Sequence, residues 1–161
     1  QKSAANLSAQ IQEGKMRKIY AAVVCGKPVD NNGTYVDYLK QDKKNNCSRI
    51  VDKSDPESKR AELEYKVLDC IQTEEKDPQY LSLVEIKLLT GRHHQIRVQF
   101  SGHGTPLYGD GKYGNNEKAV RKSLALCACH LKFKHPATGK IMDFQIKPDT
   151  GAFKLFSKNI L

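Results

Sequence analysis

Tryptophan is absent from this sequence of 161 residues, and aromatic residues make up only 7% of it. Stacking on a flat ring system therefore falls to tyrosine, phenylalanine, histidine or arginine. The sequence also lacks a long apolar run and a signal-peptide pattern, so nothing in it predicts a membrane partner or secretion. The five cysteines are odd in number and irregularly spaced, which disfavours a disulfide framework. We therefore expect a cytoplasmic protein.

Acidic residues are fewer than basic residues. Lys and Arg total 27 against 18 Asp and Glu, for a net charge of +9. Such an excess favours a polyanionic partner through phosphate contacts and counterion release, although ordinary solubilising charge is the alternative. Residues 40–60 carry seven Lys or Arg against four Asp or Glu. That span suits contact with a nucleic acid and, equally, a solvated hairpin tip.

The hydrophobic pattern predicts many strands joined by hairpins, with few helices. Strands are expected at residues 16–25, 34–39, 48–51, 61–72, 80–89, 124–134 and 141–147. Helices are expected at residues 1–13, 92–101 and 151–161, with Thr90 as a cap of the second. This order predicts a single α+β domain over residues 1–161, with a mainly antiparallel or mixed sheet and helices at its periphery.

One stretch concentrates glycine, planar cations and hydrogen-bonding side chains: residues 90–98 (TGRHHQIRV), followed by residues 104–110 (GTPLYGD). On the predicted helix, Arg97 lies at the edge of the apolar face of Ile96 and Phe100. A guanidinium fixed there offers a fork of donors to a carboxylate or a phosphate. The alternative is a boundary arginine that covers the core with its aliphatic stem.

The same stretch resembles the motif of the RluA-type RNA pseudouridine synthases, T-G-R-x-H-Q-I-R-V with the continuation G-x-P-x-x-G-D-x-x-Y-G. The matching residues are Thr90, Gly91, Arg92, His94, Gln95, Ile96, Arg97, Val98, Gly104, Pro106, Gly109, Asp110, Tyr113 and Gly114. Residues 18–23 (KIYAAV) and 126–136 agree in order and spacing. The resemblance runs from near residue 1 to about residue 147.

The resemblance implies the pseudouridine synthase fold, a long mixed sheet bent across two subdomains with a catalytic cleft between them. It implies an isomerase that converts uridines of ribosomal or transfer RNA to pseudouridine without a cofactor or a metal ion. By the match, Arg97 pairs with the nucleophilic carboxylate, and Tyr20 packs on the target base. Leu126 supplies apolar packing beneath the base. Arg92, His94 and Gln95 suit contacts with phosphate or supporting contacts.

The family's nucleophilic aspartate lies in an H-R-L-D-x-x-x-S-G motif upstream of the K-x-Y segment, and the sequence contains no such motif. We therefore expect residues 1–161 to be the carboxy-terminal part of a catalytic domain, truncated on its amino-terminal side and inactive alone. Exposed apolar surface or a bare sheet edge, with self-association, is the expected result.

Other aspartates do not replace the missing one. Asp110 lies between two glycines, where a turn is the favoured interpretation. Asp37 and Asp69 occur within apolar runs and are expected to face solvent. The sequence departs from the family pattern at Gln99, Thr105 and Cys127, where histidine is common, so no family role is carried over to these positions.

The cluster of Cys127, Cys129, His130 and His135 suggests zinc but lacks a C-x-x-C pair. On a strand the two cysteines face one way and His130 the other. Buried small hydrophobic residues are therefore the favoured interpretation, with no metal site.

Two alternative functions stay open. The basic charge alone would support an RNA-binding module without catalysis. A hydrolase that uses Ser101 and His103 is the weaker alternative, because the sequence identifies no acid to orient the histidine.

Overall fold

A single antiparallel sheet organises the molecule. The computed structural model describes residues 2–73, 80–114 and 123–156, and within them seven strands follow the order β3-β2-β4-β5-β1-β6-β7. All six neighbouring pairs are antiparallel. The strands are β1 (Arg17–Cys25), β2 (Asn32–Asp42), β3 (Cys47–Ile50), β4 (Lys59–Gln72), β5 (Tyr80–Leu88), β6 (Leu126–Lys134) and β7 (Ile141–Gln145). The mainly antiparallel α+β fold predicted from the sequence is confirmed.

The centre of the sheet is apolar because both of its faces are covered. α2 (Gln95–Gly102) lies on one face, where Ile96 and Phe100 pack against Ala22 and Val24 of β1. On the other face the 3-10 helix η2 (Gly151–Phe156) joins a second buried cluster, which contains other side chains of β1. Strands covered on both faces have near-continuous apolar runs, as in the middle of β1.

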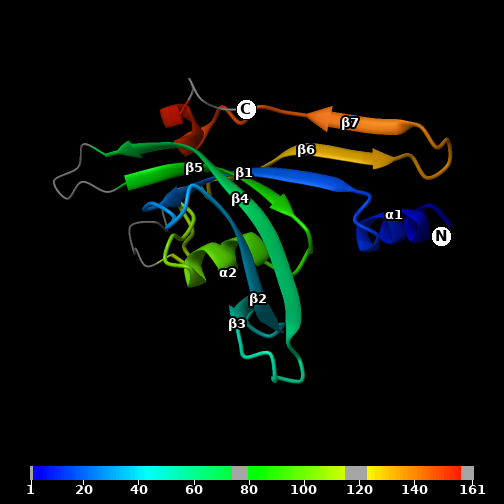
Figure 1. Ribbon diagram of the computed structural model, residues 1–161, viewed down its shortest axis with the longest axis horizontal. Coiled ribbons are helices and arrows are strands. Elements are labelled where there is room, and N and C mark those ends of the chain that lie inside the picture. The colour runs from blue at the N-terminus through cyan, green and yellow to red at the C-terminus, as the bar shows by residue number, and fades with distance from the viewer. Residues whose placement is uncertain (1, 74–79, 115–122, 157–161) are drawn as a thin grey trace.

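The periphery extends from this centre in two directions (Figure 1). The β2–β3 hairpin and the adjoining end of β4 project on the side of α2, and we call residues 38–60 the arm. The β6–β7 hairpin projects away from the arm, to the right in Figure 1, with α1 (Lys2–Gln12) beside it. Gln10 fastens α1 to β6, because its side chain bonds both the N–H (2.9 Å) and the carbonyl (2.7 Å) of Lys134.

The predicted boundaries hold for most elements and fail at two. β2 begins at Asn32, earlier than predicted, because Gly33 pairs with Tyr65 and lies against its ring instead of forming a turn. α2 begins at Gln95, not at residue 92, because His94 adopts a left-handed backbone (φ 52°). Thr90 therefore does not cap the helix. Residues 77–78 and 157–161, predicted as connection and helix end, lie outside the described residues.

Apolar side chains are exposed along the β6–β7 hairpin. Ile141 is 62% exposed and Phe144 52% exposed, both on the edge strand β7. Self-association through this edge stays a prediction. No helix among the described residues has the length and apolar character to cross a membrane.

The packing of α2 predicts a large effect of Phe100. Phe100→Ala should lower the free energy of unfolding by about 3–5 kcal/mol, because it empties a fully buried site between the helix and the sheet. Urea unfolding measures this loss. Leu155→Ala is the control, since Leu155 is 55% exposed. Equal losses in the two variants would contradict the packing described for α2.

Candidate active site

Gln95 organises the loop that precedes α2. Its Oε1 accepts hydrogen bonds from the hydroxyl of Thr90 (2.8 Å) and the backbone N–H of Arg92 (2.9 Å). Its Nε2 donates to the carbonyl of Glu62 on β4 (3.1 Å) and to Oε1 of Gln99 (3.0 Å). The side chain is buried, so its contacts support the motif from within the protein.

Arg97 and Asp110 form a bidentate ion pair. The Nε of Arg97 lies 2.8 Å from Oδ2 and its Nη2 lies 2.7 Å from Oδ1. Asp110 is 1% exposed, whereas the Arg97 side chain is 18% exposed. Oδ1 also accepts the backbone N–H groups of Lys112 and Tyr113, each at 2.9 Å. The predicted turn at Asp110 is therefore present, and the same carboxylate anchors the helix.

The electrostatics of Asp110 result from two opposed effects. Burial, the largest, would raise its pKa, but the Arg97 guanidinium and the two backbone N–H groups lower it further than burial raises it. The carboxylate is thus ionised at neutral pH. Its charge in turn raises the pKa of Arg97, mainly through their hydrogen bonds.

This pair adds a partner that the sequence did not predict. Arg97 was expected to hold a carboxylate absent from the chain, which stays a prediction, and its fork also holds Asp110, thirteen residues along. Asp110 was expected only to form a turn, so its contact with Arg97 was not predicted. No described residue accepts a hydrogen bond from Nη1 of Arg97, so the guanidinium keeps donors for a second acceptor.

Tyr113 links the pair to His94. The guanidinium carbon of Arg97 lies 4.9 Å from the centre of the Tyr113 ring, and the Tyr113 hydroxyl lies 2.8 Å from Nδ1 of His94. Burial, and then the positive charge of Arg97, lower the pKa of His94. The imidazole is therefore neutral at neutral pH, and its Nδ1 shares a hydrogen bond with the Tyr113 hydroxyl. The same hydroxyl accepts the backbone N–H of Ser48 at 2.9 Å.

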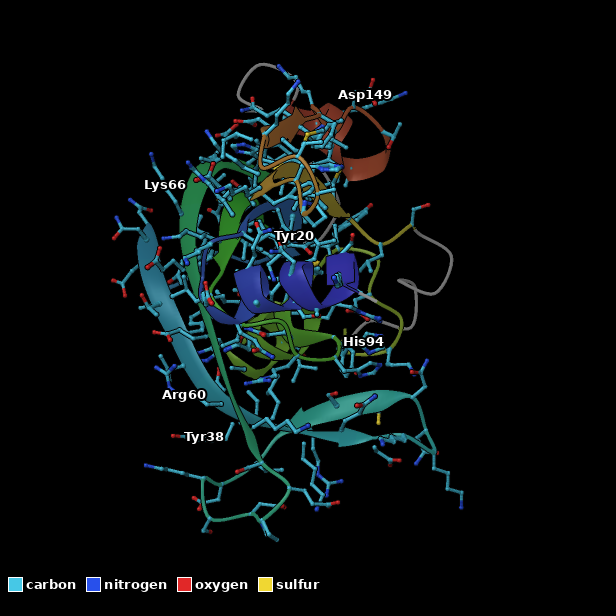
Figure 2. The ribbon with its side chains drawn as sticks, turned by 90° about the vertical axis from the view of Figure 1, so that its right-hand side faces the viewer. Tyr20, Tyr38, Arg60, Lys66, His94 and Asp149 are labelled. Atoms are coloured by element: carbon cyan, nitrogen blue, oxygen red, sulfur yellow. The ribbon has the colours of Figure 1, made fainter. Side chains whose placement is uncertain are left out.

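Tyr20 and Leu126 lie on adjacent strands beneath α2. Leu126 pairs with Ala22 and Tyr20 with Ala128, and both side chains pack against the apolar cluster that contains Ile96. Figure 2 shows Tyr20 in the body of the molecule, far from Tyr38 and Arg60 on the arm. Burial raises the pKa of Tyr20, so its hydroxyl is protonated at neutral pH. The fold thus brings Tyr20, Leu126 and the helix of Arg97 to one face of the sheet.

Arg92 lies apart from this group. Its Nε donates to the carbonyl of Arg60 at 2.9 Å, and the rest of its side chain borders the arm. The roles predicted for Arg92, His94, Leu126, Tyr20 and Arg97 stay predictions.

Asp37 does not simply face solvent, contrary to expectation. Its Oδ2 accepts from Nε2 of Gln99 at 2.7 Å and lies 3.1 Å from Nε2 of His103. His103 thus has an orienting acid that the sequence did not reveal. The Ser101 hydroxyl, however, donates to the carbonyl of Tyr113 at 2.6 Å. Ser101 and His103 therefore do not form the pair that a hydrolase requires.

The cysteine and histidine cluster is altered by a β-bulge. Register shifts between Ile19 and Tyr20, so that Ile19 pairs with His130 and both line one hollow with Cys129. The prediction that His130 faces away from Cys129 was therefore wrong, because a bulge breaks the alternation of a strand. His130 bonds Asp143 at 2.8 Å, and the described residues contain no group of three metal-ligating side chains.

Comparison with known proteins places these residues in context. Residues 1–102 match the family model described as RNA pseudouridylate synthase. Ribosomal large subunit pseudouridine synthase D of Zymomonas mobilis is 34% identical, over 87% of this chain and 44% of that protein. Ribosomal large subunit pseudouridine synthase C of Rickettsia bellii is 30% identical, over 90% of this chain and 46% of that protein. The chain spans about half the length of the curated relatives it matches.

A solved structure shares the fold. Human RNA Pseudouridylate Synthase Domain Containing 1 superposes with a TM-score of 0.73 at 23% identity, over 91% of this chain and 60% of that one.

The buried ion pair predicts a pH-dependent contribution to stability. Asp110→Asn should cost about 3 kcal/mol at neutral pH, because it leaves Arg97 without its partner. The folded-state pKa of Asp110 is lowered, so its stabilisation is present above the unfolded value of about 3.9 and is lost as pH falls through the folded value. Urea unfolding should show the two proteins converging below about pH 4.

Asp143→Asn is the matched control for this measurement. Asp143 is partly exposed and pairs with Lys132 and His130 on the surface, where solvent screens an ion pair and makes its contribution small. A cost for Asp110→Asn no larger than that of Asp143→Asn would contradict the role assigned to the buried pair.

Proposed function

The chain belongs to the RNA pseudouridylate synthase family, and from this premise we propose that the whole protein isomerises specific uridines of RNA to pseudouridine. One observation carries the proposal. Arg97 of the family motif is held by Asp110 on the face of the sheet that also presents Tyr20, and it keeps donors for a second acceptor.

The reaction needs a carboxylate beside the base. A uridine leaves its stack, its N1 glycosidic bond is cleaved, and the base turns and rejoins the ribose through C5. A cation beside the nucleophilic carboxylate keeps it ionised and orients it. We assign this task to the remaining donors of Arg97. Since the H-R-L-D motif is missing from these 161 residues, we propose that the carboxylate is supplied from outside them.

Tyr20 and Leu126 are proposed to hold the base. The ring of Tyr20 offers an apolar surface with a polar tip, which suits packing on a uracil. Its raised pKa means that it meets the base as a neutral hydroxyl at neutral pH. Assistance in removing the C5 proton would therefore require the hydroxyl to lose its own proton first.

Ribosomal RNA is the substrate class we propose first, because the two relatives described above are named for the large ribosomal subunit. Transfer RNA is the second candidate. A non-catalytic RNA-binding module is the alternative function, and its support is the net charge of +9.

Release of tritium from RNA labelled at C5 of uridine tests the activity. A longer protein, translated from the same reading frame and extended by the residues encoded before Gln1, should release tritium and form pseudouridine. The 161-residue chain should bind RNA without releasing tritium. Release by the 161-residue chain would disprove the external carboxylate. RNA binding with no release by either protein would favour the non-catalytic module.

Tyr20→Phe tests the role of the hydroxyl in the active product. We expect the rate of tritium release to fall by about 100-fold, with RNA affinity unchanged, because proton transfer by a positioned side chain contributes at least that much. Tyr38→Phe is the control, since Tyr38 lies on the arm. A normal rate in Tyr20→Phe would remove the hydroxyl from the mechanism.

A further inference from the structure

A polar hollow of about 460 Å³ lies between the arm and the loop that precedes α2. Three cationic side chains border it: Lys43 in the turn that follows β2, Lys59 at the start of β4, and Arg92 of the motif. Ser48 and His93 add polar groups, and Glu57 is the single acidic residue in the lining. The hollow therefore combines cations from the arm with a cation from the motif.

The acidic residues of the arm are already engaged. Lys40 approaches Oε2 of Glu57 at 2.5 Å and Oδ2 of Asp55 at 3.3 Å. Asp42 accepts hydrogen bonds from Asn45, and Asp52 accepts them from Ser54. Each carboxylate thus has a partner within the arm itself.

The cations that face the hollow are not neutralised in this way. Within the described residues, Lys43, Lys59 and Arg92 form no ion pair. Arg92 uses only its Nε, on the carbonyl of Arg60, and this bond aims the guanidinium while both terminal nitrogens stay available. The hollow carries an excess of positive charge as a result.

The hollow is also fixed relative to the candidate active site. Lys112 donates to the carbonyls of Asn45 (3.2 Å) and Asn46 (2.8 Å) and so holds the turn of the arm. The hydroxyl of Tyr113 holds the N–H of Ser48 at 2.9 Å. Lys112 and Tyr113 both donate their backbone N–H groups to Asp110, the partner of Arg97. A ligand in the hollow would be held in a set relation to Arg97.

We propose that this hollow binds backbone phosphates of the RNA strand next to the target uridine. The inference rests on the proposed function, since it assumes RNA as the substrate. Two lysine point charges and an arginine fork match phosphate oxygens. Phosphate contacts fix register and orientation without reading sequence. The hollow thus positions the strand, while Tyr20 contacts the base and Arg97 orients the carboxylate.

Binding of the 161-residue chain to a fluorescein-labelled single-stranded RNA tests this proposal. Lys43→Gln/Lys59→Gln should weaken binding by roughly tenfold, because each lysine contributes a phosphate contact. The slope of log K against log salt should become less steep by about 1.4, since each contact to a single strand contributes about 0.7. Thermal unfolding should stay unchanged, because neither lysine side chain makes an ion pair among the described residues.

Lys66→Gln/Lys154→Gln is the matched control. It removes the same charge from two exposed positions, on β4 away from the arm and on η2. Arg92→Gln should also weaken binding, and Arg92→Lys should restore only part of the loss, because a single point charge would replace the arginine fork.

The outcomes separate the two proposals. The phosphate site is supported if only the variants at Lys43, Lys59 and Arg92 bind RNA more weakly and show a less steep slope of log K against log salt. Equal losses in both lysine pairs overturn it, because binding would then follow overall charge, and they leave the proposed isomerase intact. Absence of RNA binding by the unaltered chain counts against both.

Discussion

The ion pair of Arg97 and Asp110 is the contact on which the candidate site depends. It joins α2 to the turn that follows it, because one buried carboxylate receives the arginine fork and two backbone N–H groups. Tyr113, fixed by that turn, then holds His94 and the arm through a single hydroxyl. A buried charge is costly unless all its hydrogen-bonding capacity is used, so this arrangement favours one geometry over many.

α2 needs this support because it is only eight residues long. A helix of that length is not stable by itself in water, and its structure must come from tertiary contacts. Ile96 and Phe100 provide the apolar contacts. Gln95 and Gln99 provide polar ones, since their amides bond the backbone of β2 and β4. The helix is thus attached to the sheet by apolar and polar contacts on the same face.

The sequence predicted the strands well, because alternation and hairpin punctuation are local signals that the sheet preserves. It singled out Tyr20 and Leu126 as candidates only through family resemblance, and Arg97 through helix periodicity as well. The contacts of Gln99 and His103 with Asp37 could not be predicted, since their partners lie more than sixty residues away in the chain. The bulge at Cys129 was not predicted either. It arises from the pairing of β1 with β6, and the sequence of neither strand alone indicates it.

The strand order has a consequence for how the chain is made. β1 lies between β5 and β6, and both neighbours follow it by more than fifty residues. During synthesis the apolar residues of β1 therefore emerge long before their partners exist, and such pairings form slowly because of their loop-closure entropy. We expect the nascent chain to rely on chaperones until β5 emerges, with β6 closing the sheet late in translation.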